Sequence, residues 1–331
     1  MEERTLSKIS FFGVFLTLVV ISLGAWVRLT DAGLGCPDWP GCYGILGTPD
    51  TDVEIQQAKI LFPESIIDID KAHREMMHRY FAGMLGIYVL VLSFLSNRYS
   101  KERYIFVPVL LVLLIIFQSL LGMWTVTELV KPTIVTAHLV TAMITASLIF
   151  WNGLKFFHPN IDSQNQKLFL IGVLCTVVLI IQIIIGGWTS TNYASLACTD
   201  FPKCLGQWWP DNMKFKDAFV ISGLPNINYE GGHLTHESKI TIHFIHRFWA
   251  LCTTALFSLL FIYIFYFQKS CTFKRIGLLI LFIFLIQIFL GISNVVYSLP
   301  LSIAVLHTTN ASVLLLSMTL LLYYSTYQGR E

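Results

Sequence analysis

Eight long runs of apolar residues, separated by polar segments, follow one another along the chain. Each run carries few or no charged side chains and is long enough to cross about 30 Å of bilayer hydrocarbon as a helix. The pattern therefore predicts eight transmembrane helices, four in each half. Their expected bounds are 9–27, 79–96, 104–126, 133–154, 168–188, 246–267, 276–298 and 301–324. The last two share one uncharged run, which Pro300 divides.

An internal repeat accounts for the equal division of the helices. The segment from Gly24 to Gly44 recurs as the segment from Gly186 to Gly206, and nine aligned positions are identical without a gap. They include a tryptophan, an aspartate, a proline and two cysteines, which chance similarity between apolar segments would not match. The chain is therefore a tandem duplication. The expected domains are 1–157, with an outer loop at 28–77, and 158–331, with an outer loop at 189–242.

Lysine and arginine predict the orientation of these helices. If the helices alternate in direction, most basic residues fall on one side of the membrane, which is cytoplasmic by the positive-inside rule. These residues are Arg4, Lys8, Arg98, Lys101, Arg103, Lys155, Lys167, Lys269, Lys274, Arg275 and Arg330. The expected fold is an all-α polytopic membrane protein, built as two pseudo-symmetric four-helix bundles with both termini cytoplasmic. Because each repeat has an even number of helices, a pseudo-two-fold axis along the membrane normal should relate the halves.

Composition agrees with a membrane protein. Of the 331 residues, 55% are hydrophobic and only 13% are charged, and the mean hydropathy is +0.67, which excludes a soluble domain. The net charge of +2, with no basic run, gives no reason to expect nucleic acid. No transit-like leader precedes the first predicted helix, which favours a bacterial plasma membrane, with the long loops on its outer face.

Four histidines recur through the repeat. His78 matches His246, each followed by arginine, and His138 matches His307. All four fall near the outer ends of predicted helices that run from outside to inside, so they should lie at one depth. Two helices in each half would then each present one imidazole. This arrangement is typical of a metal or haem held between the facing helices of a bundle.

Other roles are open to these histidines, since each could instead hydrogen-bond a neighbouring helix. Zinc or copper would require further ligands, whereas a haem needs two axial nitrogens and an apolar slot. Ala82, Gly83 and Gly86, which follow His78, would help to form such a slot. The arginines that follow His78 and His246, Arg79 and Arg247, would pair with haem propionates or anchor the helices at the interface.

The two halves differ beside the first histidine. Glu75 precedes His78 by three residues, whereas His243 occupies the matching place before His246. Residues three apart share a helix face, if the helix extends that far. A carboxylate there can take a proton or stabilise developing positive charge, whereas a second imidazole would hydrogen-bond a propionate or the loop. The difference suggests that one half performs chemistry and the other holds a permanent cofactor.

Glutamines form another repeated feature of the spans. Gln118, Gln182 and Gln287 are each followed four residues later by glycine. A polar side chain beside a small residue most simply joins two helices at close approach. We therefore expect these glutamines to serve helix packing.

Cysteines also follow the repeat. Cys36 with Cys42, and Cys198 with Cys204, each form the pattern C-x-D-x-P-x-C in an outer loop. Oxidising conditions outside the cell favour disulfides there, so each pair is either a structural disulfide or a redox-active thiol pair. A zinc site from all four is disfavoured, because the C-x-x-C spacing is absent.

In combination these motifs resemble the haem A synthase family. The resemblance rests on RLTDAGLGCPDWPGCYG in the first outer loop, E-x-x-H-R from Glu75 to Arg79, G-x-x-T-V from Gly122 to Val126, and the four placed histidines. It covers nearly the whole chain. It implies eight helices in two pseudo-symmetric bundles. It also implies an oxidoreductase that converts the C8 methyl of haem O, by successive hydroxylations and loss of water, to the formyl group of haem A.

The resemblance assigns roles to particular residues. His246 and His307 would be the axial ligands of a haem b cofactor, and His78 and His138 would hold the substrate haem O. Glu75 would be the catalytic carboxylate. The family emphasises a cysteine pair in the first outer loop, whereas this chain has a second pair as well.

The resemblance also implies partners. Electrons would come from a quinol or a membrane redox protein, and haem O synthase and the assembly of a terminal oxidase would be neighbouring functions. Two other functions remain as alternatives. One is a quinol-linked di-haem b electron-transfer cytochrome, which would have no use for the difference between Glu75 and His243. The other is a transporter with parallel repeats, which should show charged groups near mid-membrane.

Overall fold

The computed structural model describes residues 2–100, 105–157 and 165–326, and among them the regular structure is helical. Eight helices are long and apolar enough to cross a membrane, which confirms the predicted number. They are α1 (Glu3–Leu29), α3 (Ile69–Tyr99), α4 (Phe106–Thr127), α5 (Pro132–Phe157), α6 (Gln166–Thr191), α8 (His236–Ile262, continued by the π-helix η1, Tyr263–Phe267), α9 (Cys271–Val296) and α10 (Leu301–Thr326). The basic residues Lys101, Arg103 and Arg330, and the start of the second predicted domain at 158, lie outside the described residues.

Two helices begin much earlier than the apolar pattern predicts. Helix α3 starts at Ile69 rather than 79, and α8 at His236 rather than 246. Their first turns are polar and resemble loop, but the N-cap side chains of Asp68 and Thr235 each accept a hydrogen bond from a backbone amide of the first turn. The predicted loops 28–77 and 189–242 therefore include these turns and two short helices, α2 (Asp52–Leu61) and α7 (Phe215–Ala218).

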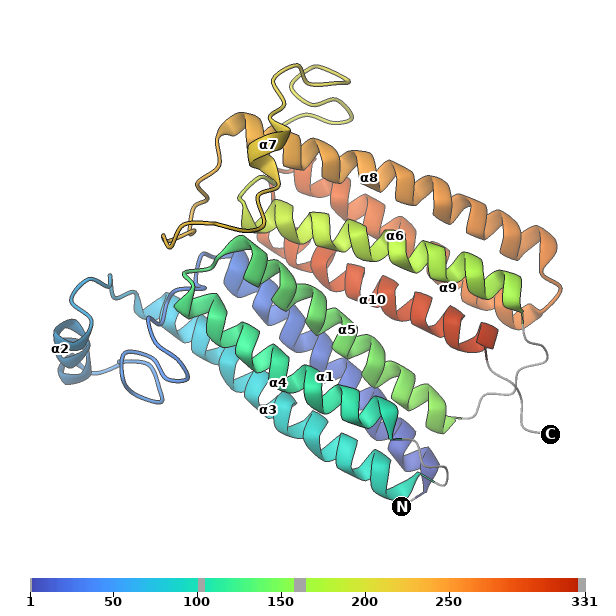
Figure 1. Ribbon diagram of the computed structural model, residues 1–331, viewed down its shortest axis with the longest axis horizontal. Coiled ribbons are helices and arrows are strands. Elements are labelled where there is room, and N and C mark those ends of the chain that lie inside the picture. Colours follow the sequence, from blue (N-terminus) through green and yellow to red (C-terminus); the bar gives the residue numbers. More distant parts are fainter. Residues whose placement is uncertain (1, 101–104, 158–164, 327–331) are drawn as a thin grey trace.

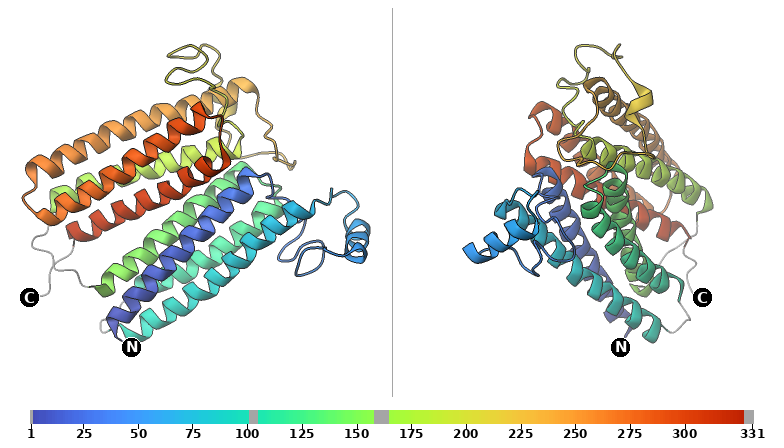
Figure 2. Two further views of the ribbon diagram at one scale, coloured as in Figure 1. Left: turned by 180° about the vertical axis from the view of Figure 1, so that it is seen from behind. Right: turned by 60° about the vertical axis from the view of Figure 1, so that its left-hand side comes forward.

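The long helices lie side by side in two groups of four (Figure 1). Helices α1, α3, α4 and α5 form the first group, and α6, α8, α9 and α10 form the second. The groups meet through α1 and α5 on one side and α6 and α10 on the other, around a continuous apolar core. Figure 2 shows that the long loops gather at one end, while α1 begins and α10 ends at the other.

Matching turns connect the last two helices of each group. Between α4 and α5, Leu129 and Val130 adopt φ values of 53° and 51°, and between α9 and α10, Ser298 and Leu299 adopt 57° and 62°. Two consecutive left-handed residues are unusual for non-glycine side chains. Since the two pairs occupy matching places in the repeat, α5 and α10 leave their turns in the same way.

Candidate functional site

Two of the predicted ligands pack against the glycines that open the repeated segment. His78 on α3 lies against Gly24 on α1, where an added Cβ would be 2.9 Å from the imidazole Cε1. His246 on α8 lies in the same way against Gly186 on α6, with a corresponding distance of 3.0 Å. A side chain at either position would press against the imidazole and displace it. The close approach of the imidazole therefore explains why glycine recurs at both positions of the repeat.

The other two predicted ligands also face glycines. His138 on α5 lies over Gly122 on α4, and a Cβ on that glycine would be 3.5 Å from Cε1. His307 on α10 lies over Gly291 on α9, with a corresponding distance of 3.1 Å. Each histidine is thus held between helices of its own group.

The structure brings the four histidines together in two pairs. His78 and His138 lie within electrostatic range of each other in the first group, as do His246 and His307 in the second. Within residues 2–100, 105–157 and 165–326, no cluster of three or more His, Cys, Asp or Glu side chains is placed to hold a metal ion. As predicted ligands, the two imidazoles of each group would match the axial requirement of a haem.

Glutamine amides reach three of these imidazoles. The Nε2 to Nδ1 distances are 3.1 Å for Gln118 and His138, 3.2 Å for Gln182 and His246, and 3.4 Å for Gln287 and His307. The glutamines do join neighbouring helices, as the sequence predicts, but their partners are the predicted ligands themselves. This role was missed, although the equal separation of 20 residues in two of the pairs was visible in the sequence.

Glu75 lies on the same helix as His78, because α3 extends through both. Its side chain is only 4% exposed. One carboxylate oxygen accepts a hydrogen bond from the backbone amide of Cys36 at 2.8 Å, and the other accepts from Arg79 at 2.5 Å. The carboxylate therefore connects the helix that carries His78 to the first disulfide loop.

His243 makes the matching connections in the second group. It is also 4% exposed, and its Nδ1 accepts a hydrogen bond from the backbone amide of Cys198 at 3.2 Å. The Nε of Arg247 lies 3.1 Å from the other ring nitrogen, Nε2. That nitrogen carries the imidazole proton when Nδ1 accepts, so the two contacts are not hydrogen bonds in the same tautomer. Since Cys198 is the counterpart of Cys36, the two residues have the same structural partners. Only the chemistry differs, because a carboxylate stands in one group and an imidazole in the other.

The two arginines bind the disulfide loops. Arg79 donates to the carbonyl of Asp38 at 2.9 Å and also to that of Gly41. Arg247 donates to the carbonyls of Asp200 and Cys198 at 2.8 and 2.7 Å. Their guanidinium groups therefore fix the loops over the histidines. Contact between these arginines and a haem propionate stays a prediction.

Both cysteine pairs form disulfides. The Sγ atoms of Cys36 and Cys42 are 2.01 Å apart, and those of Cys198 and Cys204 are 2.00 Å apart. Each bond closes a short loop at the looped end of its helix group. The same geometry serves a structural disulfide and a redox-active pair.

The aspartate inside each C-x-D-x-P-x-C motif organises the loop, a role that the sequence did not suggest. Asp38 accepts hydrogen bonds from the backbone amides of Tyr43 and Gly44 at 2.6 and 2.9 Å. Asp200 does the same for its own loop, and donation by the amide of Gly206, above all, holds the pKa of Asp200 below its ordinary value. The repeated aspartate is thus a turn-forming residue.

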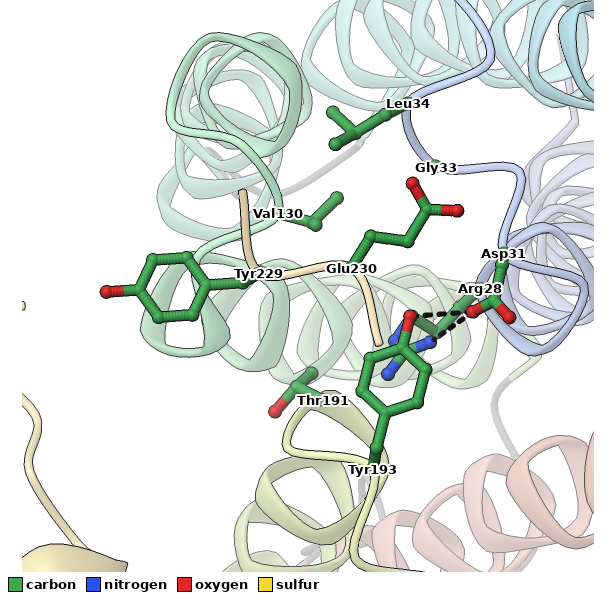
Figure 3. A pocket seen from close by; sticks show the side chains of 9 residues that line it. All are labelled: Arg28, Asp31, Gly33, Leu34, Val130, Thr191, Tyr193, Tyr229 and Glu230. Atoms are coloured by element: carbon green, nitrogen blue, oxygen red, sulfur yellow. Dashed lines mark hydrogen bonds and ion pairs between the residues drawn. The ribbon is translucent and has the colours of Figure 1, made fainter. Parts of the chain in front are cut away.

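A shallow pocket lies where the two groups meet at their looped end (Figure 3). The guanidinium of Arg28 lies 4.1 Å from the centre of the Tyr193 ring and donates to the carbonyl of Ser190 at 2.5 Å. The Tyr193 hydroxyl donates to Asp31 at 2.6 Å, and burial raises the pKa of that phenol. Glu230 also lines the pocket (Figure 3), and its carboxylate pairs with Lys71 at 2.8 Å.

Known proteins resemble the chain along most of its length. Residues 7–319 match COX15-CtaA, a family described as cytochrome oxidase assembly protein. A haem A synthase of Shewanella oneidensis is 43% identical over 311 residues, which cover 93% of each chain. A haem A synthase of Bartonella tribocorum is 24% identical over 91% of this chain and 87% of its own length. One of Shouchella clausii is 32% identical over 63% of this chain and 65% of its own length.

The extent of the family match confirms the family expected from the sequence, since it runs from within the first long helix to within the last. The chain belongs to the COX15-CtaA family of cytochrome oxidase assembly proteins.

Proposed function

We propose that this chain is a haem A synthase, an integral membrane oxidoreductase that oxidises the C8 methyl of haem O to the formyl group of haem A. The observation that carries this function is the 43% identity to a haem A synthase over 93% of both chains. Two hydroxylations of the methyl carbon give a hydrated aldehyde, which loses water to leave the formyl group. The four electrons removed from that carbon pass to an external oxidant. A quinol-linked di-haem cytochrome is not favoured, because the relatives are named for haem A synthesis.

His246 and His307 would hold a haem b cofactor, and His78 and His138 would hold the substrate haem O. Two structural features support these pairs. A glycine admits each ring closely, and the two imidazoles of each pair lie within electrostatic range of each other in their own helix group. Two facing imidazoles are the donor set that a haem takes. When bound, haem b would supply a redox-active iron beside the substrate half.

Glu75 would be the catalytic carboxylate. The two groups place side chains of the same connectivity at this position, but only the first offers an acid. A carboxylate close to the substrate can accept a proton as a C–H bond is oxidised, or stabilise positive charge that develops there. Its bond to Arg79 would keep it oriented between turnovers.

The membrane arrangement is also part of the proposal. A pseudo-two-fold axis along the membrane normal would relate the groups, domains 1–157 and 158–331 would contain one site each, and both termini would be cytoplasmic. The long loops would face outward from a bacterial plasma membrane. The electron donor would be a quinol or a membrane redox protein, and haem O synthase and terminal oxidase assembly would precede and follow this step.

Co-expression with a source of haem O tests the function directly. The haems are extracted from the membranes and separated by chromatography, with His78→Ala as a control that keeps the second histidine pair. We expect haem A with the parent chain and haem O alone with the control. Abundant, haem-loaded parent protein that produces no haem A would contradict the proposal.

A further inference from the structure

The environment of one histidine differs from that of the other three. A glutamine Nε2 lies within hydrogen-bond distance of Nδ1 in His138, His246 and His307, and in His307 it lies 3.3 Å from Nε2 as well. The Nδ1 of His78 is buried and has no such partner among the described residues. The proposed substrate site and the proposed cofactor site therefore differ in two ways. One is the acid at Glu75, and the other is the glutamine amide beside a histidine ring, which His78 lacks.

A single position in the repeat accounts for this difference. Gln182 stands four residues before Gly186 on α6, and Val20 stands four residues before Gly24 on α1. The glycines themselves meet the His246 and His78 rings at nearly equal distances, 3.0 and 2.9 Å. The two rings are thus packed alike, and only the side chain one helical turn away has changed from an amide to a hydrocarbon.

The amide of Gln182 is suited to orient a coordinating imidazole. A histidine bound to iron through Nε2 carries its proton on Nδ1, and a hydrogen bond from that N–H fixes the ring and raises its basicity. The Oε1 of Gln182 is buried without a partner in the described part of the chain. Rotation of the amide by half a turn presents this oxygen to Nδ1, in place of the bond that Nε2 donates to the His246 carbonyl at 3.2 Å. In Gln118 and Gln287, by contrast, Oε1 already accepts from Thr141 and Asn310.

We propose that Gln182 is the positioning residue that retains haem in the second group, and that Val20 at the matching place allows the first group to release its haem. The inference rests on the proposed function, in which the second group keeps haem b while the first must accept haem O and release haem A. Loss of a hydrogen bond to a metal-bound histidine weakens metal binding by about 10- to 100-fold. The same chain would then contain one tight and one exchangeable site.

Haem transfer to excess apomyoglobin tests the tight site. The purified full-length protein is mixed with apomyoglobin, and the loss of its haem b is followed by absorbance. We expect Gln182→Val to release haem b about 10 to 100 times faster than the parent. Gln182→Glu keeps an acceptor for the Nδ1 proton, so its rate should stay near that of the parent while the haem b midpoint potential falls. A parental rate for Gln182→Val would overturn the proposal.

The reciprocal substitution tests the exchangeable site in the first group and leaves the residues of the second group unchanged. Val20→Gln should supply the missing amide to His78, so that haem A made during co-expression leaves the purified enzyme at least tenfold more slowly. Unchanged release of haem A in a folded Val20→Gln protein would also overturn the proposal. His246→Ala separates the two levels of inference, because a normal haem b spectrum in that variant would reject the ligand assignment itself.

Discussion

The hydroxyl group of Tyr193 donates a hydrogen bond to Asp31 at 2.6 Å, and the two residues occupy the same position in the two copies of the repeat. Arg28 and Ser190, which also touch, are counterparts as well. Equivalent positions of two copies meet only near the axis that relates them. These contacts between the helix groups therefore support a pseudo-two-fold axis that passes between α1 and α6 at the looped end.

Loss of this contact should weaken the association of the two groups. Tyr193→Phe removes one hydrogen bond, so we expect a loss of about 1 kcal/mol in the free energy of unfolding and a melting temperature lower by about 2 to 4 °C. Tyr229→Phe is a matched control, because that hydroxyl donates to Pro225 within its own loop. Thermal unfolding in detergent, with Asp31→Ala added to complete a double-mutant cycle, measures the coupling. Strict additivity of Tyr193→Phe and Asp31→Ala would show that the contact contributes nothing.

The sequence predicted the number of long helices, the break at Pro300 and the positions of the four histidines. These features follow from hydropathy and from the repeat, and both can be found by comparing stretches of the sequence alone. The starts of α3 and α8 were predicted too late, because their first turns are polar and project beyond the apolar spans. A helix of this kind depends on its cap, as at Asp68, rather than on hydropathy.

Contacts between distant side chains were less accessible to sequence analysis. The acidic position at Glu75 was recognised as different from His243, but its bond to the amide of Cys36 depends on how the loop folds back over α3. The same holds for Asp38, whose carboxylate closes the turn that carries Cys42. Alignment of the two copies of the repeat predicts which residues are equivalent. It does not predict which side chains or backbone groups each residue contacts.

The histidine pairs should be separable by spectroscopy. His246→Ala and His307→Ala each remove one imidazole of the second pair, so we expect purified protein that lacks the low-spin haem b spectrum. His138→Ala, in the first pair, should keep that spectrum and lose haem A production. Reduced-minus-oxidised difference spectra on equal amounts of protein make the comparison. A normal haem b signal in His246→Ala or His307→Ala would contradict the assignment.

The disulfides can be assigned a structural or a redox role by comparing the two loops. If both are structural, Cys36→Ser and Cys198→Ser should each lower the free energy of unfolding by about 2 kcal/mol, with similar effects on haem A yield. If the first pair carries electrons, Cys36→Ser alone should abolish haem A production. Chromatography of extracted haems and thermal unfolding of both variants distinguish these results. Mass spectrometry without reduction should detect both disulfides in the parent protein, and free thiols there would contradict both bonds.

The position occupied by Glu75 allows the structural and chemical roles of one residue to be tested separately. Glu75→Ala removes the acceptor for the Cys36 amide as well as the carboxylate, so it perturbs the loop and the chemistry together. Glu75→His instead installs the side chain that accepts the matching amide in the second group. We expect Glu75→His to keep haem b and resist proteolysis of the first loop as the parent does, yet to make little haem A, because an imidazole cannot supply the negative charge. Chromatography of extracted haems measures the haem A yield, and limited proteolysis of the same protein reports on the loop. A parental haem A yield would show that Glu75 has only a structural role.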